Sequence, residues 1–341
     1  MSMLRAEPAE GGRAATRDLT FGQAIKEALA QEMRRDPRVF IIGEDVAEAG
    51  TVFKVLTGLV EEFGAKRVLD SPISEAGITG IGVGAAMTGM RPVVDIMFGD
   101  FITLAMDQIV NQAAKVHYMS GGKLRVPMVI RTTMGATRRS AAQHSQSLHV
   151  WPAHVPGLRV ALPSTPADAK GLLVTAIRDD NPVVFFEDKM MYGLKGPVPE
   201  GEYAIPFGVA DIKRPGTDIT IVATSSMVHV ALEAAKALEG AGISAEVIDP
   251  RTLAPLDAET LIASAQKTGR AIVVDEGYQQ FGATAEIAAV IADGAFDYLD
   301  APVKRIGAMN VPVPFSPVLE DQTVPTADSV AAAAKALCGR E

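Results

Sequence analysis

The sequence contains almost no cysteine, with Cys338 as the single thiol among 341 residues. One thiol can form neither a disulfide framework nor a cysteine metal site within a chain, so we expect a reducing compartment, the cytoplasm. Long hydrophobic runs are also lacking, since no stretch approaches the ~20 apolar residues that span a bilayer. Basic residues are outnumbered, 32 against 41 acidic ones, which gives a formal net charge of −9. This charge disfavours nucleic acid and anionic membranes as partners.

Two further features are absent: a targeting signal at the amino end and a glycine-rich fingerprint for dinucleotide binding. The first eighteen residues have no apolar signal-peptide core, and Glu7, Glu10 and Asp18 are atypical of an organelle transit peptide. We therefore expect a disordered tail over residues 1–18. No G-x-G-x-x-G fingerprint is present, which disfavours a nicotinamide dehydrogenase.

What is present is an alternation of short apolar runs with longer segments of helical periodicity, over a chain long enough for two domains. Such runs are typical of strands that are covered on both faces by crossover helices. They lie at residues 39–46, 92–98, 126–132, 158–164 and 182–188, and in the second half at 217–226, 244–252, 269–277 and 302–309. We predict an α/β protein of two domains, each a mostly parallel sheet covered by helices.

A stretch rich in glycine and proline separates the two halves of the chain. This composition interrupts both regular structures. We therefore predict domains over residues 19–195 and 206–341, joined by a linker at 196–205. A second proline-rich stretch, at 310–325, predicts an extended arm before a last helix.

Residues 70–101 carry the most informative pattern. Ser74 is placed to cap a helix whose first turn contains Glu75, where a carboxylate offsets the positive helix end. Glycines then recur along that helix, at a cost of ~1 kcal/mol each relative to alanine. They occupy positions 77, 80, 82, 84 and 89. They predict that either a partner helix or a flat ligand comes very close to the backbone.

Seven motifs, in order along the chain, resemble those of one family. They are SPISEAGITGIGVGAAMTGMRPVVDIMFGDF, DQIVNQAAKVHYMSGGKLRVPMVIRTT, AAQHSQSLHVW, HVPGLRVALPSTPADAKGLL, AIRDDNPVVFFEDKMMYG, VIDPRTLAPLD and VPFSPVLEDQ. Together they are similar to the beta subunit of thiamine-diphosphate-dependent 2-oxo acid dehydrogenases, which include pyruvate, acetoin and branched-chain members. The resemblance implies a transketolase-like pyrimidine-binding domain followed by a transketolase C-terminal-like domain.

The resemblance also implies roles for four residues around the cofactor thiamine diphosphate. In that family the position of Glu75 hydrogen-bonds a ring nitrogen of the aminopyrimidine and stabilises the imino tautomer, which removes a proton from the thiazolium carbon. Phe101 matches an aromatic residue that packs against the pyrimidine, and Ile73 and Met97 match positions near the same ring. From the residues alone, a plain core role for these last three side chains stays open.

The histidines are individually weak signals, because most histidines are structural or solvated. His144, within AAQHSQS, matches the active-site histidine of the family, which is expected to position or protonate the dithiolane of a lipoyl group during acyl transfer. His117 is expected to be structural, and His149 has no assignment. The adjacent Arg138 and Arg139 are expected to be solvated or to line a channel mouth that receives an acidic substrate.

The resemblance also implies two metal ions, potassium and magnesium. Family members hold potassium through backbone oxygens in the segment that matches residues 176–182, and hard cations favour such donors. The candidate carbonyl groups belong to Met128, Ala176, Asp179 and Asn181, although a helix end and turn would explain the same residues. Enzymes of this type bind the diphosphate through magnesium held by a Gly-Asp-Gly motif, which this chain lacks. The resemblance assigns that magnesium to an alpha subunit, in an assembly of two alpha and two beta chains.

Negative charge is concentrated at the carboxyl end. From Asp275 to Glu341 there are ten acidic and four basic residues, a net charge of −6. Solvated helix faces would explain this. In the family, however, the C-terminal domain docks the small basic subunit-binding domain of the lipoyl acyltransferase core, and an acidic surface would steer that encounter.

We therefore expect the beta subunit of the thiamine-diphosphate-dependent component of a pyruvate or acetoin dehydrogenase complex. This oxidoreductase would be active only with its alpha subunit. It would form hydroxyethyl-thiamine diphosphate from the substrate and pass the acyl group to lipoyl groups of the acyltransferase. A branched-chain 2-oxo acid dehydrogenase beta subunit and a non-catalytic assembly subunit are the alternatives.

Overall fold

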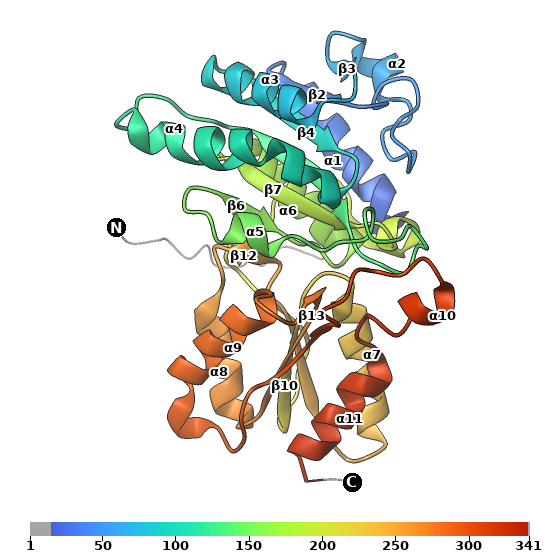
Figure 1. Cartoon of the computed structure of the whole chain (residues 1–341), viewed down its shortest axis with the longest axis vertical. Coiled ribbons are helices and arrows are strands. Elements are labelled where there is room, and N and C mark those ends of the chain that lie inside the picture. Colours follow the sequence, from blue (N-terminus) through green and yellow to red (C-terminus); the bar gives the residue numbers. More distant parts are fainter. Residues whose placement is uncertain (1–14, 340–341) are drawn as a thin grey trace.

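The computed structural model describes residues 15–339. Two α/β domains lie one above the other, the first at the top of the view and the second below it (Figure 1). Each has its own mostly parallel sheet with helices on both faces, which confirms the predicted fold class. Each of the nine runs predicted as strands overlaps an observed strand. No helix in this part of the chain is both long and apolar enough to cross a membrane.

The sheet of the first domain has seven strands in the order β12-β6-β7-β5-β4-β2-β3. Six of them run parallel: β2 (Val39–Gly43), β3 (Val68–Asp70), β4 (Arg91–Ile96), β5 (Val129–Met134), β6 (Arg159–Ala161) and β7 (Val183–Asp188). The seventh, β12 (Thr252–Ala254), belongs to the second half of the chain and pairs antiparallel with β6. This strand ties the two halves together, a crossing that the sequence did not indicate.

Alternate side chains of these strands point to opposite faces of the sheet. Ile41 therefore lies in a core covered by α1 (Phe21–Arg35) and α6 (Pro166–Arg178), while Ile42 lies in a second core on the other face. Helix α3, segment η2 and helix α4 contribute to that second core. The remaining helical segments of this domain are α2 (Leu59–Phe63), α3 (Glu75–Met87), η1 (Gly99–Ala105), η2 (Gln108–Ala113), α4 (Ala114–Met119), α5 (Val150–Ala153) and η3 (Met191–Gly193).

The second domain has a five-stranded sheet in the order β14-β13-β10-β11-β9. Its strands are β9 (Asp211–Arg214), β10 (Ile219–Ala223), β11 (Ala245–Asp249), β13 (Ala271–Tyr278) and β14 (Lys304–Ala308), of which only β9 is antiparallel to its neighbour. Helices α7 and α11 cover one face, and α8 and α9 the other. The helical segments are α7 (Met227–Glu239), α8 (Ala258–Thr268), α9 (Ala283–Gly294), η4 (Phe296–Tyr298), α10 (Pro317–Glu320) and α11 (Ala327–Leu337). Helix α10 interrupts the predicted extended arm.

The stretch between the domains differs from its prediction. The expected linker at 196–205 begins inside a strand, β8 (Lys195–Pro199), which pairs antiparallel with β1 (Thr16–Thr20). Strand β1 also starts within the expected tail at 1–18, of which residues 1–14 lie outside the described part of the chain. Pairing with a distant partner therefore gives both segments a regular structure that their composition does not favour.

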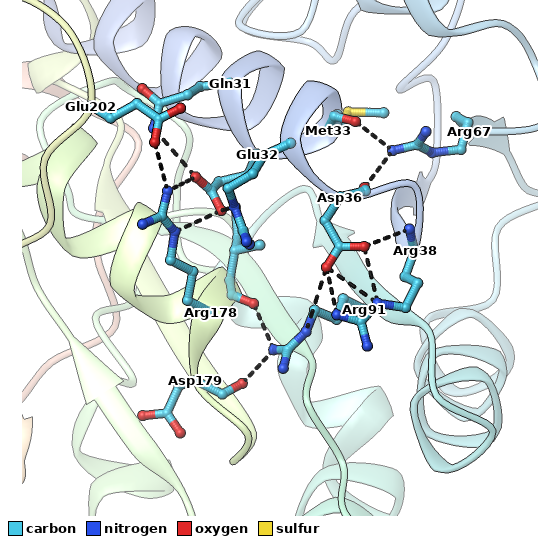
Figure 2. A network of polar contacts seen from close by, with 12 residues as sticks. Gln31, Glu32, Met33, Asp36, Arg38, Arg67, Arg91, Arg178, Asp179 and Glu202 are labelled. Atoms are coloured by element: carbon cyan, nitrogen blue, oxygen red, sulfur yellow. Dashed lines mark hydrogen bonds and ion pairs between the residues drawn. The ribbon is translucent and has the colours of Figure 1, made fainter.

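A network of polar contacts closes the end of the first sheet at which the strands begin (Figure 2). Glu32 on α1 is fully buried and accepts hydrogen bonds from Arg178 on α6 and from Arg35. Burial opposes the ionisation of Glu32, but these two guanidinium groups outweigh it and lower the pKa of the carboxyl. Arg91, the first residue of β4, donates to the backbone carbonyl of Asp179. The network fixes α1 and α6 to the sheet and leaves the opposite edge for other roles.

Candidate active site

The carboxyl ends of the parallel strands meet at one edge of the first sheet. Glu44 follows β2, Glu75 follows β3, Met97 follows β4, and the segment 135–149 follows β5. In open parallel sheets, ligands bind outside this edge, where neighbouring loops diverge. The fold thus brings residues from separate parts of the sequence to one side of the domain.

Glu75 is the first residue of α3. Ser74 is the N-cap, and its hydroxyl oxygen accepts a hydrogen bond from the backbone N–H of Gly77 at 3.3 Å, which confirms the predicted helix start. Glu75 is only 7% exposed, and it lies at the positive end of a thirteen-residue helix. A carboxyl group in this position is suited to hydrogen-bond a polar ring edge.

One of the glycines of α3 lies against the sheet of the same domain. A Cβ at Gly82 would meet Val94 Cγ2 at 2.5 Å and Met128 Cε at 3.0 Å, so this glycine lets the helix lie directly on the sheet. At Gly84 a Cβ would meet nothing within 4 Å. The close neighbour of Gly82 is therefore the sheet, while the approach of a partner helix or a flat ligand to the other glycines stays a prediction.

Glu44 is a residue that the sequence analysis missed. One of its carboxyl oxygens is buried and has no hydrogen-bond partner among the described residues. Burial first, and then the nearby carboxylate of Glu75, raise the pKa of Glu44. The two carboxyl groups are therefore near enough for the charge of one to oppose the ionisation of the other. A polar residue directly after a buried apolar strand was the signal that could have found it.

His144 lies between two aromatic rings. Its imidazole meets the ring of Phe98 edge to face, with the ring centroids 4.7 Å apart, and the ring of Phe101 in the same way at 5.2 Å. Phe101 belongs to η1, which packs against α3, the helix that Glu75 begins. The structure thus brings His144 and Phe101 together, as predicted residues of one site, and adds Phe98, which was not singled out.

Met97 and Ile73, the other two predicted residues near the pyrimidine, differ from each other in their exposure to solvent. Met97 is partly buried just after β4, and its carbonyl oxygen accepts a hydrogen bond from the hydroxyl of Thr133 at 2.9 Å. Ile73 is 82% exposed, so a core role for this side chain is wrong. A large apolar side chain at this edge is available to a ligand or to another chain.

Comparisons with known proteins now identify the family. Residues 17–195 match the transketolase pyrimidine-binding domain, and residues 208–330 match the transketolase C-terminal domain. The chain is 52% identical over 335 residues to the acetoin:2,6-dichlorophenolindophenol oxidoreductase subunit beta of Bacillus subtilis strain 168, covering 95% of this chain and 98% of the relative. It is 48% identical over 320 residues to the pyruvate dehydrogenase E1 component subunit beta of Rickettsia felis, covering 94% and 98%. The chain belongs to this family of pyruvate and acetoin dehydrogenase beta subunits.

A solved structure agrees with this placement at the level of the fold. It is described as a split gene transketolase, inactive beta4 tetramer, and it matches with a TM-score of 0.77 at 23% sequence identity. The match covers 94% of this chain and 98% of that chain. Both domains and their arrangement are therefore transketolase-like.

The family uses thiamine diphosphate, and the residues at the sheet edge fit one half of that cofactor. Glu75 offers a buried carboxyl to an aminopyrimidine, Phe101 offers an apolar ring face, and the buried oxygen of Glu44 is left for a proton or a further partner. Among residues 15–339, no group of three or more His, Cys, Asp or Glu side chains is placed to hold a metal ion. The described residues thus suit the pyrimidine half of the cofactor.

The predicted potassium donors lie at the end of α6, in the turn before β7 and directly before β5, and Figure 2 shows one of them, Asp179. The carbonyl of Asp179 already accepts a hydrogen bond from the Arg91 guanidinium at 2.9 Å, and the carbonyl of Met128 accepts one from Val183 N–H at 2.9 Å. Each carbonyl oxygen has a second lone pair. Oxygen donors remain available for a cation, but a guanidinium group lies beside them.

The segment 135–149 also contacts the second domain. His149, which had no assignment, is buried, and its Nε2 lies 3.0 Å from Oδ2 of Asp275 on β13. Burial opposes the ionisation of Asp275, but the interactions with His149 and with the hydroxyl of Thr224 outweigh it and lower the pKa of Asp275. His149 therefore joins the two domains just beyond His144. His117 has a simpler role, since its Nδ1 lies 2.8 Å from the carbonyl oxygen of Leu124.

Proposed function

We propose that this chain is the beta subunit of the thiamine-diphosphate-dependent component of an acetoin or pyruvate dehydrogenase complex. Relatives named for each of these activities share about half of its residues over nearly their whole length. The observation that carries the proposal is the gathering of Glu75, Phe101 and His144 at the carboxyl edge of one parallel sheet. A non-catalytic assembly subunit would have no need of these three residues together.

Bound thiamine diphosphate would supply a carbon nucleophile for the carbonyl group of the substrate and an electron sink for the resulting charge. Glu75 would hold a proton against a ring nitrogen of the aminopyrimidine. Glu44, whose pKa is raised by burial and by the charge of Glu75, would be a second carboxyl group near this site that can take up a proton. Phe101 would present its ring to the pyrimidine and exclude water from it.

His144 would act at the later, acyl-transfer stage. Imidazole is the side chain that most readily moves a proton near neutral pH. The edges of Phe98 and Phe101 restrict the orientation of the His144 ring. In this position His144 would donate a proton to a sulfur of the lipoyl dithiolane as the acyl group arrives.

The remaining partners follow the same proposal. An alpha subunit, in an assembly of two alpha and two beta chains, would hold the diphosphate and its magnesium. The acidic surface of the second domain would dock the basic subunit-binding domain of a lipoyl acyltransferase core, in the cytoplasm. Potassium would bind the carbonyl oxygens around Asp179 and Met128, and a thermal shift in potassium chloride over sodium chloride would support that site.

The test is activity after co-expression with the alpha subunit, with acetoin, pyruvate and branched-chain 2-oxo acids as substrates and 2,6-dichlorophenolindophenol as electron acceptor. We expect Glu75→Gln to lose turnover by about 100-fold or more, because its amide cannot exchange the proton. The control is Glu61→Gln, an exposed glutamate on α2, which keeps full turnover. Wild-type turnover in the folded Glu75→Gln complex overturns the proposal.

A second variant separates the two stages. His144→Ala is expected to slow acyl transfer to a lipoyl domain far more than reduction of the artificial acceptor, because only the first reaction needs a proton for the dithiolane. Equal loss in both assays contradicts the role of His144, while leaving the role of Glu75 to stand on its own test.

A further inference from the structure

The segment that carries His144 is held in an unusual backbone conformation. Thr137, Arg139 and Ala141 have φ angles of 66°, 60° and 59°. The left-handed region costs a non-glycine residue roughly 1–2 kcal/mol. Three such residues within five positions persist only when their surroundings impose the conformation.

The ends of the segment are fixed by several hydrogen bonds. At its start, the N–H of Ala136 donates to Glu276 of the second domain at 2.6 Å, and buried Lys189 donates to the carbonyl oxygen of Gly135. At its end, the side chain of Gln146 donates to Asp100 at 2.9 Å. These contacts do not reach the strained residues between them.

Arg139 makes the contact that does reach them. Its guanidinium donates to Glu320 at 2.7 Å and, through two nitrogens, to Asp321 at 2.6 and 3.1 Å. Its backbone N–H donates to Glu320 as well, at 3.2 Å. Glu320 is the last residue of α10, and Figure 1 shows this short helix at the junction of the two domains. The second domain thus binds both the backbone and the side chain of Arg139.

The burial of Glu320 makes its carboxylate dependent on this contact. Glu320 is fully inaccessible, and its other carboxyl oxygen is buried without a hydrogen-bond partner among the described residues. A buried carboxylate needs a positive partner, and Arg139 supplies it. The neighbouring Arg138 behaves differently: it is exposed, and its guanidinium stacks over the ring of Phe53 at 5.1 Å.

Ala141 is in direct backbone contact with His144. In its left-handed conformation Ala141 directs its carbonyl oxygen to the backbone N–H of His144, at 3.5 Å. His144 then lies between the rings of Phe98 and Phe101. A chain of contacts therefore leads from α10 of the second domain to the imidazole in the first.

We propose that Arg139 and Glu320 form an interdomain clamp that holds the residues 137–146 in the strained conformation which presents His144 for acyl transfer. Both are positioning residues, acting through the backbone of this segment. The proposal rests on the acyl-transfer role of His144 for its kinetic readout. Its structural readout, the order of the segment, is independent of that role.

The test uses the complete alpha and beta assembly with Arg139→Met, which keeps the length of the side chain and removes its charge. We expect acyl transfer to a lipoyl domain to fall by about 10- to 100-fold, since small displacements of a reacting group have effects of this size. Reduction of 2,6-dichlorophenolindophenol with the same substrate should stay within about twofold, because it does not need the dithiolane proton. Arg139→Lys, which keeps the charge without the planar fork, should recover part of the transfer rate.

Hydrogen exchange supplies the readout that does not depend on activity. The amides of residues 137–146 should exchange about tenfold faster or more in Arg139→Met than in wild type. The matched control is Arg34→Met on α1, which breaks an exposed two-bond pair with Glu62 on α2 and leaves the segment 137–146 unchanged. If Arg139→Met fails to assemble, Asp321→Asn replaces it. Asp321 is exposed and accepts two hydrogen bonds from the guanidinium of Arg139.

Unchanged exchange in residues 137–146 overturns the clamp, whatever the kinetics. An equal loss of both activities also overturns it, since that is the signature of general destabilisation. Faster exchange with normal acyl transfer means that the clamp orders the segment without positioning His144, which refutes the proposal. If His144→Ala itself transfers acyl groups normally, the proposed role of His144 has failed, and hydrogen exchange alone decides whether the clamp exists.

Discussion

Arg131 on β5 balances two buried carboxylates beneath the candidate active site, and its removal should destabilise the first domain strongly. Its guanidinium donates to both oxygens of Glu187 on β7, at 2.5 and 2.8 Å, and also to Asp95 on β4. Arg131 is 3% exposed, Asp95 6% and Glu187 not at all. The hydroxyl of Tyr192 donates to Glu187 at 2.8 Å and completes the network.

The cost of Arg131→Met follows from this burial. Leaving buried charges without a partner costs roughly 3–5 kcal/mol. In a domain of this size, each kcal/mol lowers Tm by roughly 2–4 °C, so we expect a loss on the order of 10 °C. Arg34→Met, which breaks an exposed pair, should cost only about 0–1 kcal/mol. The contrast between the two variants isolates the effect of burial.

The pH dependence of this loss has a definite sign. Burial raises the pKa of Asp95 and of Glu187, while Arg131 pulls both pKa values back down. Without Arg131, the folded protein holds protons that the unfolded chain has released, so the stability of the variant falls as the pH rises above about 4. The deficit relative to wild type is therefore largest near pH 8 and shrinks toward about pH 5.

Urea unfolding followed by far-ultraviolet circular dichroism, at these two pH values, measures both effects. Wild type, Arg131→Met and Arg34→Met are compared under identical conditions. A wild-type midpoint for Arg131→Met would refute the reasoning about buried charge. A deficit of equal size at both pH values would refute the reasoning about protonation.

Two further predictions use the same unfolding assay. Burial, and then the neighbouring Asp188, raise the pKa of Glu276 well above its usual range, so the contribution of Glu276 to wild-type stability falls as the pH rises above about 4.5. Glu276→Gln removes this dependence and should be at least as stable as wild type near pH 8; a clear loss there contradicts it. Gly82→Ala should cost about 1–3 kcal/mol through its clash with Val94, whereas Gly84→Ala, in open space, should gain about 0.5–1 kcal/mol. Equal effects of the two alanines would show that the close approach at Gly82 is unimportant.

Local chemistry explains which parts of the fold could be predicted. Apolar runs such as 39–46 and 182–188 indicated strands because burial on both faces of the sheet favours apolar side chains at successive positions. The start of α3 followed from the capping chemistry of Ser74, which acts over three residues. Strands β8 and β12 could not be predicted in this way. Each is short, and pairing with a strand far away in the sequence decides its structure.

The same distinction applies to the site. Glu75 and His144 were found because the motifs around them are contiguous in the sequence. The significance of Glu44 depends on Glu75, 31 residues further along, and appears only when β2 and β3 pair. The sequence gives even less indication of the role of Arg139, because its partner Glu320 lies 181 residues further along the chain. Composition assigned Arg139 to solvent or a channel mouth because nothing local distinguishes a clamped arginine from a solvated one.

Three left-handed residues in a segment without glycine at those positions show why the second domain matters for the first. Local preference favours a relaxed backbone at Thr137, Arg139 and Ala141, and the contact of Arg139 with Glu320 on α10 opposes that preference. Strain of this kind has no signature in composition, because it is imposed by neighbours rather than chosen by the residues. A functional segment whose conformation is imposed from another domain will therefore respond to substitutions far from the substrate, at positions such as Glu320.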